Sequence, residues 1–285
     1  MRTQYERAEE FRGLHHQTHP LILPNAWDVP SARVFEDAGF PAVATSSAGV
    51  MVSLGYPDGE EMPRDELVGA VRRIAQKLSV PLSADVVAGY GKDPPEVVST
   101  VKMMIEAGAV GINLEDGSHA TESLAPVPAQ VAKLRALREL RRASGIPFVI
   151  NARTDALNYA RGDADAKLRE AIDRLTAYRD AGADCVYPMG LKEPAAIATV
   201  VSALNCPVNV MVRPGLPPVP ELARLGVKRI SFGPAASYAT FGLLKRACEE
   251  IRTQGTYHQL TEGAITFAEL NRLAVSRRAD EPAAR

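Results

Sequence analysis

The sequence places acidic and arginine side chains at the ends of several short apolar segments. Asp85 lies one residue before the end of one such segment, Glu115 ends another, and Arg153 follows a third. Mg²⁺ prefers a few protein carboxylates together with waters and oxygens of the substrate. An arginine offers a planar pair of N–H donors that matches a carboxylate. These residue types indicate a site for a small carboxylate, in which Asp85 and Glu115 share one hard cation.

Groups beside the other apolar segments could complete this site. Successive backbone N–H groups at Ser46, Ser47 and Ala48 could bind an oxyanion or a second carboxylate. Further polar candidates for substrate contact or acid chemistry stand nearby: Trp27, Asp28, Asp58 and Asn209.

Each candidate also has a purely structural interpretation. A carboxylate such as Asp85 at the end of a strand caps the following helix more often than it binds a metal. Arg153 could be an ion-pair partner of Asp116 or Asp155, and Ser46 could belong to an ordinary loop. The argument for a site therefore depends on the elements that bring these residues together.

Eight short apolar segments have the length and composition of strands that are buried on both faces. They are Leu21–Ala26, Ala42–Ser46, Pro81–Val86, Val110–Glu115, Pro147–Asn151, Asp184–Pro188, Pro207–Met211 and Arg229–Phe232. Amphipathic segments alternate with them, several opening with proline or ending before glycine, as helices do. They are Val29–Ala38, Pro63–Leu78, Pro94–Ala107, Pro128–Ala143, Ala164–Ala181, Glu193–Ala203, Val219–Leu225 and Ala235–Arg252.

Strict alternation with short connections favours parallel strands, and eight units favour a closed (β/α)8 TIM barrel over an open doubly wound sheet. The polar residues after the strands would then face one mouth of the barrel. We expect a single domain, with the barrel at residues 1–255 and a C-terminal extension at 256–285. That extension holds an additional helix, Thr266–Val275, and a polar tail, Ser276–Arg285.

Composition narrows the class of protein. The 33 Lys and Arg residues balance 34 Asp and Glu residues, so the sequence has no basic excess that would indicate a nucleic-acid partner. It contains no apolar run of the ~18 residues that a membrane span needs, and its N-terminus lacks a signal-peptide pattern. Three widely spaced cysteines give no disulfide framework or zinc motif, which fits a cytoplasmic setting.

Four stretches taken together resemble the isocitrate lyase/phosphoenolpyruvate mutase superfamily, over about Leu21 to Gly255. They are Pro24–Asp28, Ser83–Gly91, Gly111–Asp116 and Ile150–Ala156. The resemblance implies a (β/α)8 barrel that binds Mg²⁺, with Mn²⁺ as the alternative, and that cleaves a C–C or C–P bond in a small α-oxo or 2-hydroxy carboxylate. An enolate-like anion is formed or consumed, and the metal would stabilise it as a Lewis acid.

The resemblance also implies roles for individual residues. By position, Asp85 matches the main metal-binding aspartate, Glu115 the glutamate of the metal shell, and Asp58 a further acid. Arg153 matches the arginine that holds the substrate carboxylate. Ser46–Ala48 matches the loop whose backbone N–H groups bind oxyanions.

The sequence departs from the family pattern at three places. Ser83 and Val87 stand where members carry additional acids, so the metal site is poorer. Met189 replaces a glutamate of the isocitrate and methylisocitrate lyases. The loop at 117–123 lacks the lyase Cys motif, and it offers His119 and Glu122 as a different acid/base set.

Three functions remain open on this evidence. The first is a Mg²⁺-dependent lyase-type enzyme that breaks a C–C bond in a small carboxylate. The second is phosphonopyruvate-type C–P chemistry, and the third is a weakly active carboxylate-binding barrel. The resemblance further implies a homodimer or homotetramer in which C-terminal helices exchange between subunits, and Gly255 could be the hinge.

Overall fold

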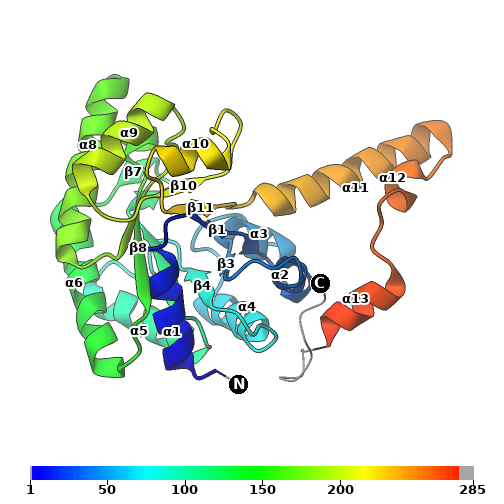
Figure 1. Cartoon of the computed structure of the whole chain (residues 1–285), viewed down its shortest axis with the longest axis horizontal. Helices are drawn as coiled ribbons and strands as arrows, with labels where there is room; N and C mark the ends of the chain where they lie inside the picture. Colours follow the sequence, from blue (N-terminus) through cyan, green and yellow to red (C-terminus); the bar gives the residue numbers. More distant parts are fainter. Residues whose placement is uncertain (1, 276–285) are drawn as a thin grey trace.

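The protein forms a closed barrel of eight parallel strands, as the sequence predicts (Figure 1). The computed structural model describes residues 2–275, and the predicted tail Ser276–Arg285 lies outside them. Pro24 divides the first barrel strand into two pieces, and an isolated parallel bridge between Val186 and Val208 closes the ring. The strands are β1 (Leu21–Leu23), β2 (Asn25–Ala26), β3 (Val43–Thr45), β4 (Leu82–Asp85), β5 (Gly111–Glu115), β8 (Val149–Thr154), β9 (Cys185–Pro188), β10 (Asn209–Met211) and β11 (Arg229–Ser231).

Helices cover the outside of the barrel, except the eighth helix of the βα units, which points away from it (Figure 1). Those of the βα units are α2 (Val29–Asp37), α4 (Arg64–Ala75), α5 (Pro94–Glu106), α6 (Val127–Ser144), α8 (Ala164–Ala181), α9 (Pro194–Leu204), α10 (Val219–Arg224) and α11 (Ala235–Gln254). Left-handed Gly145 and Gly182 end α6 and α8, where a side chain would be strained. Shorter elements at the mouth, absent from the sequence prediction, are α3 (Ser47–Ser53), α7 (Ala156–Tyr159) and the hairpin of β6 (Gly117–Ser118) and β7 (Ser123–Leu124).

The N-terminal helix α1 (Gln4–Leu14) closes the end of the barrel opposite the site. Its Phe11 is fully buried and packs with Leu23, Val110 and Val149 in a small interior cluster. A Cβ atom on Gly111 would lie 2.5 Å from the Phe11 ring, so this position of β5 must be glycine. The segment before Leu21 thus covers the bottom of the barrel.

The C-terminal helices leave the body of the barrel and return to it (Figure 1). The long helix α11 points away from the barrel, and α12 (His258–Thr261) follows its left-handed cap Gly255. The last described helix, α13 (Phe267–Ala274), packs against α2, where Arg33 Nε donates to the carbonyl of Leu273 at 2.9 Å. This confirms the additional C-terminal helix that the sequence predicts.

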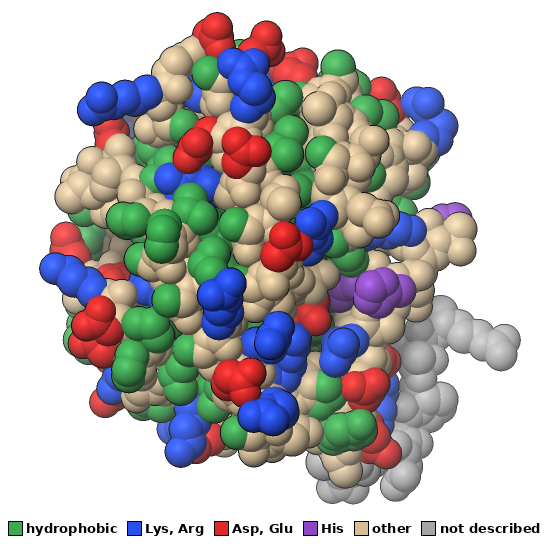
Figure 2. Space-filling model, turned by 90° about the vertical axis from the view of Figure 1, so that its left-hand side faces the viewer, with side chains coloured by type: hydrophobic (Ala, Val, Ile, Leu, Met, Phe, Trp, Pro, Cys, Tyr) green, Lys and Arg blue, Asp and Glu red, His purple; other side chains and the backbone are tan. Residues whose placement is uncertain are grey.

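The face that carries α6 and α8 mixes basic and acidic side chains without a continuous patch of one sign (Figure 2). Within residues 2–275, every helix is too short or too polar to cross a bilayer.

Candidate active site

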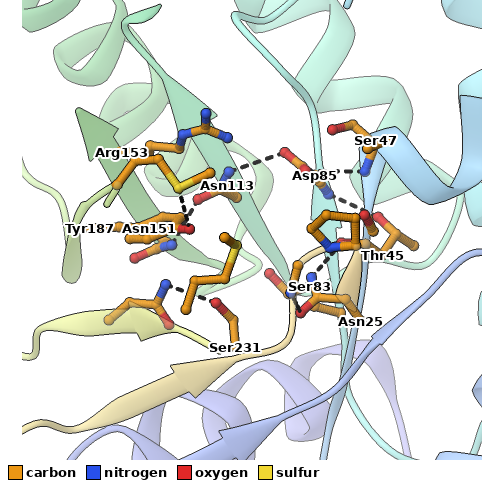
Figure 3. Close-up of a pocket in the computed structure, with 18 of the residues that line it drawn as sticks. Asn25, Thr45, Ser47, Ser83, Asp85, Asn113, Asn151, Arg153, Tyr187 and Ser231 are labelled. Atoms are coloured by element: carbon orange, nitrogen blue, oxygen red, sulfur yellow. Dashed lines mark hydrogen bonds between the residues drawn. The ribbon is translucent and has the colours of Figure 1, made fainter. Parts of the chain in front are cut away.

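A cavity of about 120 Å³ opens at the C-terminal ends of the barrel strands. Asp85 and Arg153 approach it from two sides, with Asn113 between them (Figure 3). The residues that line it are Asn25, Ala44, Thr45, Ser46, Ser47, Ala48, Asp58, Ser83, Asp85, Asn113, His119, Asn151, Arg153, Tyr187, Met189, Asn209, Met211, Arg229, Ser231, Gly233, Pro234 and Tyr238.

Strand register places the polar side chains of the site in two rows. Asp85 pairs with Asn113, and Asn113 pairs with Asn151, across β4, β5 and β8. Two residues further along the strands, Arg153 lies between Glu115 and Tyr187. Because side chains alternate along a strand, both rows point into the barrel. The alternation therefore turns separate sequence positions into one polar surface.

Asp85 is held by neighbouring hydrogen-bond donors. Its Oδ2 accepts from the backbone N–H of Ser47 at 3.1 Å, and its Oδ1 accepts from Asn113 Nδ2 at 3.0 Å. Asn151 Nδ2 in turn donates to Asn113 Oδ1 at 2.8 Å, which fixes the Asn113 amide. Thr45 Oγ1 accepts from the Asp85 N–H at 2.9 Å. Asp85 thus keeps a fixed orientation toward the cavity.

The acidic side of the cavity suits a divalent cation that binds together with a substrate. Burial raises the pKa of Asp58, and the charge of Asp85 raises it further. A cation between two repelling carboxylates would relieve that repulsion. Residues 2–275 hold no cluster of three or more His, Cys, Asp or Glu side chains that could ligate a metal. Mg²⁺ accepts such a sparse donor set, because it commonly keeps waters and takes oxygens from the substrate.

Arg153 is buried and already has partners on every side. Its Nε and Nη2 donate to the two carboxylate oxygens of Asp155 at 2.9 and 2.8 Å. Its Nη1 lies 2.6 Å from Glu115 Oε2, and the guanidinium stands over the Tyr187 ring at 5.9 Å. The pairing with Asp155 that the sequence left open is therefore present. A ligand carboxylate can reach this arginine only along its Nη1 and Nη2 edge.

Glu115 lacks the surroundings expected of the metal ligand that the sequence predicts at this position. Its carboxylate is 3% exposed, lies against Arg153, and is absent from the cavity lining. Burial raises the pKa of Glu115 well above its usual range, and the positive charge of Arg153 opposes that shift. Both observations favour a role in holding Arg153, and a direct bond from Glu115 to a metal remains a prediction.

The loop between β6 and β7 brings His119 to the cavity but leaves Glu122 outside it. His119 Nε2 lies 3.2 Å from Arg153 Nη2, and its Nδ1 lies 2.7 Å from the hydroxyl of Tyr159. Because arginine can only donate, Nε2 must accept and the proton sits on Nδ1. Glu122 is exposed in a left-handed backbone conformation (φ 46°) and is not part of the lining.

Some of the predicted substrate contacts line the cavity and others do not. Ser46, Ser47 and Ala48 line the cavity at the start of α3, but the Ser47 N–H is used by Asp85. Asn209 also lines the cavity. Trp27 and Asp28 do not, because Trp27 packs against the core and Asp28 caps α2, where its Oδ1 accepts from Ser31 N at 2.8 Å.

Several lining residues were not chosen from the sequence as site residues. Asn113 lies within β5, Arg229 begins β11, and Ser231 lies inside the predicted strand Arg229–Phe232, so attention to the ends of the predicted strands alone misses them. The signal that could have found them is a polar residue in a strand otherwise built for burial on both faces. TIM-barrel interiors are usually filled by Val, Ile and Leu. Ser83, Asn113 and Ser231 interrupt that pattern.

A buried network behind the site anchors Asp155. Asp116 accepts from Thr154 Oγ1 at 2.7 Å, Tyr178 Oη at 2.6 Å and the Asp155 N–H at 2.9 Å. Arg174 Nη1 lies 3.2 Å from the same carboxylate. The network thereby fixes the residue that orients Arg153.

We expect Asp116→Ala to lower the free energy of unfolding by about 3–5 kcal/mol, because several buried donors lose their acceptor and Arg174 keeps only the half-exposed Glu170 as a carboxylate partner. Denaturant unfolding measures the loss. The matched control is Asp180→Ala, since Asp180 is an exposed partner of Arg179, and its cost should stay below about 0.5 kcal/mol. If both variants unfold like the wild type, the network does not anchor the site.

Comparisons with known proteins agree with this fold. The family model for phosphoenolpyruvate phosphomutase matches residues 11–252. A solved structure of a Burkholderia cenocepacia protein is 38% identical, with a TM-score of 0.88, and the match covers 94% of this chain and 95% of that one. The structure of oxaloacetate acetylhydrolase is 27% identical, with a TM-score of 0.83 and 94% coverage of both chains. The 2-methylisocitrate lyase of Escherichia coli is 29% identical over 92% of this chain and 90% of the relative.

The barrel and the family model define a class of lyases and mutases that act on small carboxylates. The chain belongs to the isocitrate lyase/phosphoenolpyruvate mutase superfamily, and it is an enzyme of the lyase type found there. Named relatives act on methylisocitrate and oxaloacetate, which are small carboxylates.

Proposed function

We propose that the protein is a divalent-metal-dependent lyase that cleaves a C–C bond in a small α-oxo or 2-hydroxy carboxylate through an enolate-like intermediate. The observation that carries this proposal is the placement of Asp85 and Arg153 on two sides of one small cavity. The first residue offers a carboxylate to a cation, and the second offers positive charge to the substrate. The names of the relatives support a small-acid substrate.

In this proposal, some residues of the site bind the substrate and others transfer protons. Arg153 orients a substrate carboxylate along its Nη1 and Nη2 edge, and Glu115 and Asp155 keep the guanidinium in place. His119 Nε2 faces Arg153 at 3.2 Å, so it can take or return a proton at the substrate end held there. Asp58 lines the same cavity, and its carboxylate interacts with that of Asp85, whose charge raises the Asp58 pKa.

A divalent ion at Asp85 and Asp58 would supply Lewis-acid stabilisation of the negative charge that develops when the bond breaks. Asp85 would hold the ion directly, because Ser47 and Asn113 fix its carboxylate, and Asp58 would contribute through its neighbouring charge. Mg²⁺ fits this oxygen donor set, and Mn²⁺ is the alternative.

A turnover panel tests the proposed reaction. We would incubate the protein with oxaloacetate, 2-methylisocitrate, 2,3-dimethylmalate and phosphonopyruvate, with Mg²⁺ or with a chelator, and follow products by NMR. Cleavage of at least one acid that stops on chelation is expected. Turnover of phosphonopyruvate alone would instead establish C–P chemistry. Binding of acids without any turnover would instead establish a carboxylate-binding barrel. The small number of metal ligands among residues 2–275 is compatible with that alternative.

The C-terminal helices predict a homo-oligomer. On α11, Tyr238 is 55% and Leu244 49% exposed, and Phe267 at the start of α13 is 85% exposed. Apolar side chains so exposed on elements that leave the barrel indicate a surface that a second subunit covers. Light scattering at micromolar concentration should give a dimer or tetramer of the 30.6 kDa chain. A single species at the monomer mass would contradict helix exchange.

A further inference from the structure

The short helix α7 links the arginine of the site to the loop that carries His119. The helix begins after Asp155, whose carboxylate accepts two hydrogen bonds from Arg153. Tyr159 ends the helix, and its N–H donates to the carbonyl of Asp155 at 3.0 Å, which fixes the spacing of the two residues. The Tyr159 hydroxyl lies 2.7 Å from His119 Nδ1. One turn of helix therefore contacts both Arg153 and His119.

His119 occupies the edge of Arg153 at which a ligand carboxylate must bind. A guanidinium carries one N–H on Nε and two on each terminal nitrogen. Asp155 accepts from Nε and from one N–H of Nη2, so the remaining N–H of Nη2 points to His119 Nε2 at 3.2 Å. Glu115 lies against Nη1 at 2.6 Å. A carboxylate that takes the planar donor pair of this edge must therefore displace His119 Nε2.

Tyr159 is the partner that His119 keeps after such a displacement. Within residues 2–275, the His119 side chain has two hydrogen-bond partners, Arg153 and Tyr159. The rings of His119 and Tyr159 also meet edge to face, with their centroids 6.1 Å apart. His119 is otherwise exposed, so little besides Tyr159 would fix the imidazole once a ligand separates it from Arg153.

The hydroxyl of Tyr159 suits both protonation states of the imidazole. Arg153 only donates, so in the free protein Nε2 accepts and Nδ1–H donates to Tyr159. When Nε2 takes a proton, both ring nitrogens become donors, and Nδ1–H keeps the same acceptor. Tyr159 can therefore hold the ring while a proton is taken up and returned at Nε2.

We propose that Tyr159 is a positioning residue for His119. A ligand carboxylate displaces His119 Nε2 from Arg153, and Tyr159 keeps that nitrogen beside the bound ligand. This inference rests on the proposed function, since it assumes that His119 transfers a proton at a carboxylate held by Arg153. It adds that Arg153 covers the base in the free protein and that substrate binding uncovers it. Tyr159 is absent from the cavity lining, so it acts through His119.

Substitution of Tyr159 should separate turnover from binding. Tyr159→Phe keeps the ring and removes the hydroxyl, so kcat on the cleaved acid should fall about tenfold. Oxalate, titrated calorimetrically in the presence of Mg²⁺, should bind this variant no more than about twofold more weakly than the wild type, because His119 competes with the ligand for Arg153. Tyr5→Phe makes the same change at an exposed position of α1, at the opposite end of the barrel, and should behave as the wild type.

A double-mutant cycle identifies the residue through which Tyr159 acts. His119→Asn should lower kcat by about 10²-fold. Tyr159→Phe in the His119→Asn background should cause no further loss, because the imidazole that Tyr159 holds is then absent. Two independent structural effects would instead multiply.

The protonation of His119 gives a readout that needs no kinetics. In mildly alkaline solution, where imidazoles are neutral, ¹⁵N NMR of the free wild type should find the proton of His119 on Nδ1. The His119 signals are assigned by their loss in His119→Asn. A proton on Nε2 would contradict the hydrogen bond to Arg153 and overturn the inference.

The outcomes separate this inference from the proposed function. If the wild type neither binds nor turns over any acid, the proposed function fails and the inference fails with it. If the wild type is active but Tyr159→Phe keeps a normal kcat, or loses the same factor with and without His119, only the role of Tyr159 is overturned. A Tyr159→Phe variant that melts far below the wild type also overturns it, because the hydroxyl is then structural.

Discussion

Asp85→Asn should lower kcat/KM on the cleaved acid by on the order of 10³-fold, which corresponds to about 4 kcal/mol of transition-state stabilisation. The substitution keeps the size of the side chain but removes the charge that would hold a divalent ion. It also leaves one acceptor oxygen where two donors, the Ser47 N–H and Asn113 Nδ2, now point. Both consequences weaken the part of the cavity in which Asp85 would hold the ion.

Steady-state kinetics over a range of Mg²⁺ concentrations would measure this loss, together with Mn²⁺ binding followed by electron paramagnetic resonance. The variant should require far more metal for half-maximal activity and should bind Mn²⁺ weakly. Asp180→Asn makes the same chemical change at an exposed position and should behave as the wild type. An Asp85→Asn enzyme with normal turnover and normal metal dependence would remove Asp85 from the reaction.

Arg153→Lys should lower kcat/KM by on the order of 10²-fold, or about 2.7 kcal/mol, and leave the protein folded. The guanidinium contacts Asp155 through two nitrogens and Glu115 through the third. A lysine ammonium is a compact point charge that cannot keep both partners and also present a planar edge to a substrate. Misplacing the substrate carboxylate should reduce kcat as well as affinity.

The kinetic constants of Arg153→Lys, measured beside its thermal unfolding, separate catalysis from structure. The positive charge is kept, so Glu115 and Asp155 retain a cation and the melting temperature should change only modestly. Arg252→Lys, on the exposed face of α11, is the matched control. Near-normal turnover of Arg153→Lys would mean that the arginine only neutralises its two acids.

The sequence was sufficient to predict the barrel because its periodic signals are strong. Eight buried apolar strands and the glycine that ends α8 appear where alternation and capping indicate them. The short helix α3 was missed because its seven residues carry little helical periodicity of their own. Its start is instead fixed by tertiary context, where the Ser47 N–H donates to Asp85.

The candidate site was predicted in part, for reasons that individual residues make clear. Asp85 ends β4, Arg153 lies near the end of β8, Asp58 and His119 lie in loops, and all four line the cavity. Asp28 also follows a strand, but its side chain closes the first turn of α2, a choice that linear spacing does not reveal. The partners of Arg153 depend on the register between β5 and β8. The three-dimensional structure was therefore needed to see that Glu115 occupies a guanidinium nitrogen that a ligand carboxylate would also use.

One measurement tests the central claim most directly, which is that Asp85 and Arg153 bind a metal ion and a small acid in one cavity. A crystal grown with Mn²⁺ and oxalate would locate the ion by its anomalous scattering. We predict an anomalous peak at the Asp85 carboxylate, with oxalate between that peak and Arg153. An ion and oxalate bound elsewhere, with this cavity holding only water, would contradict the account.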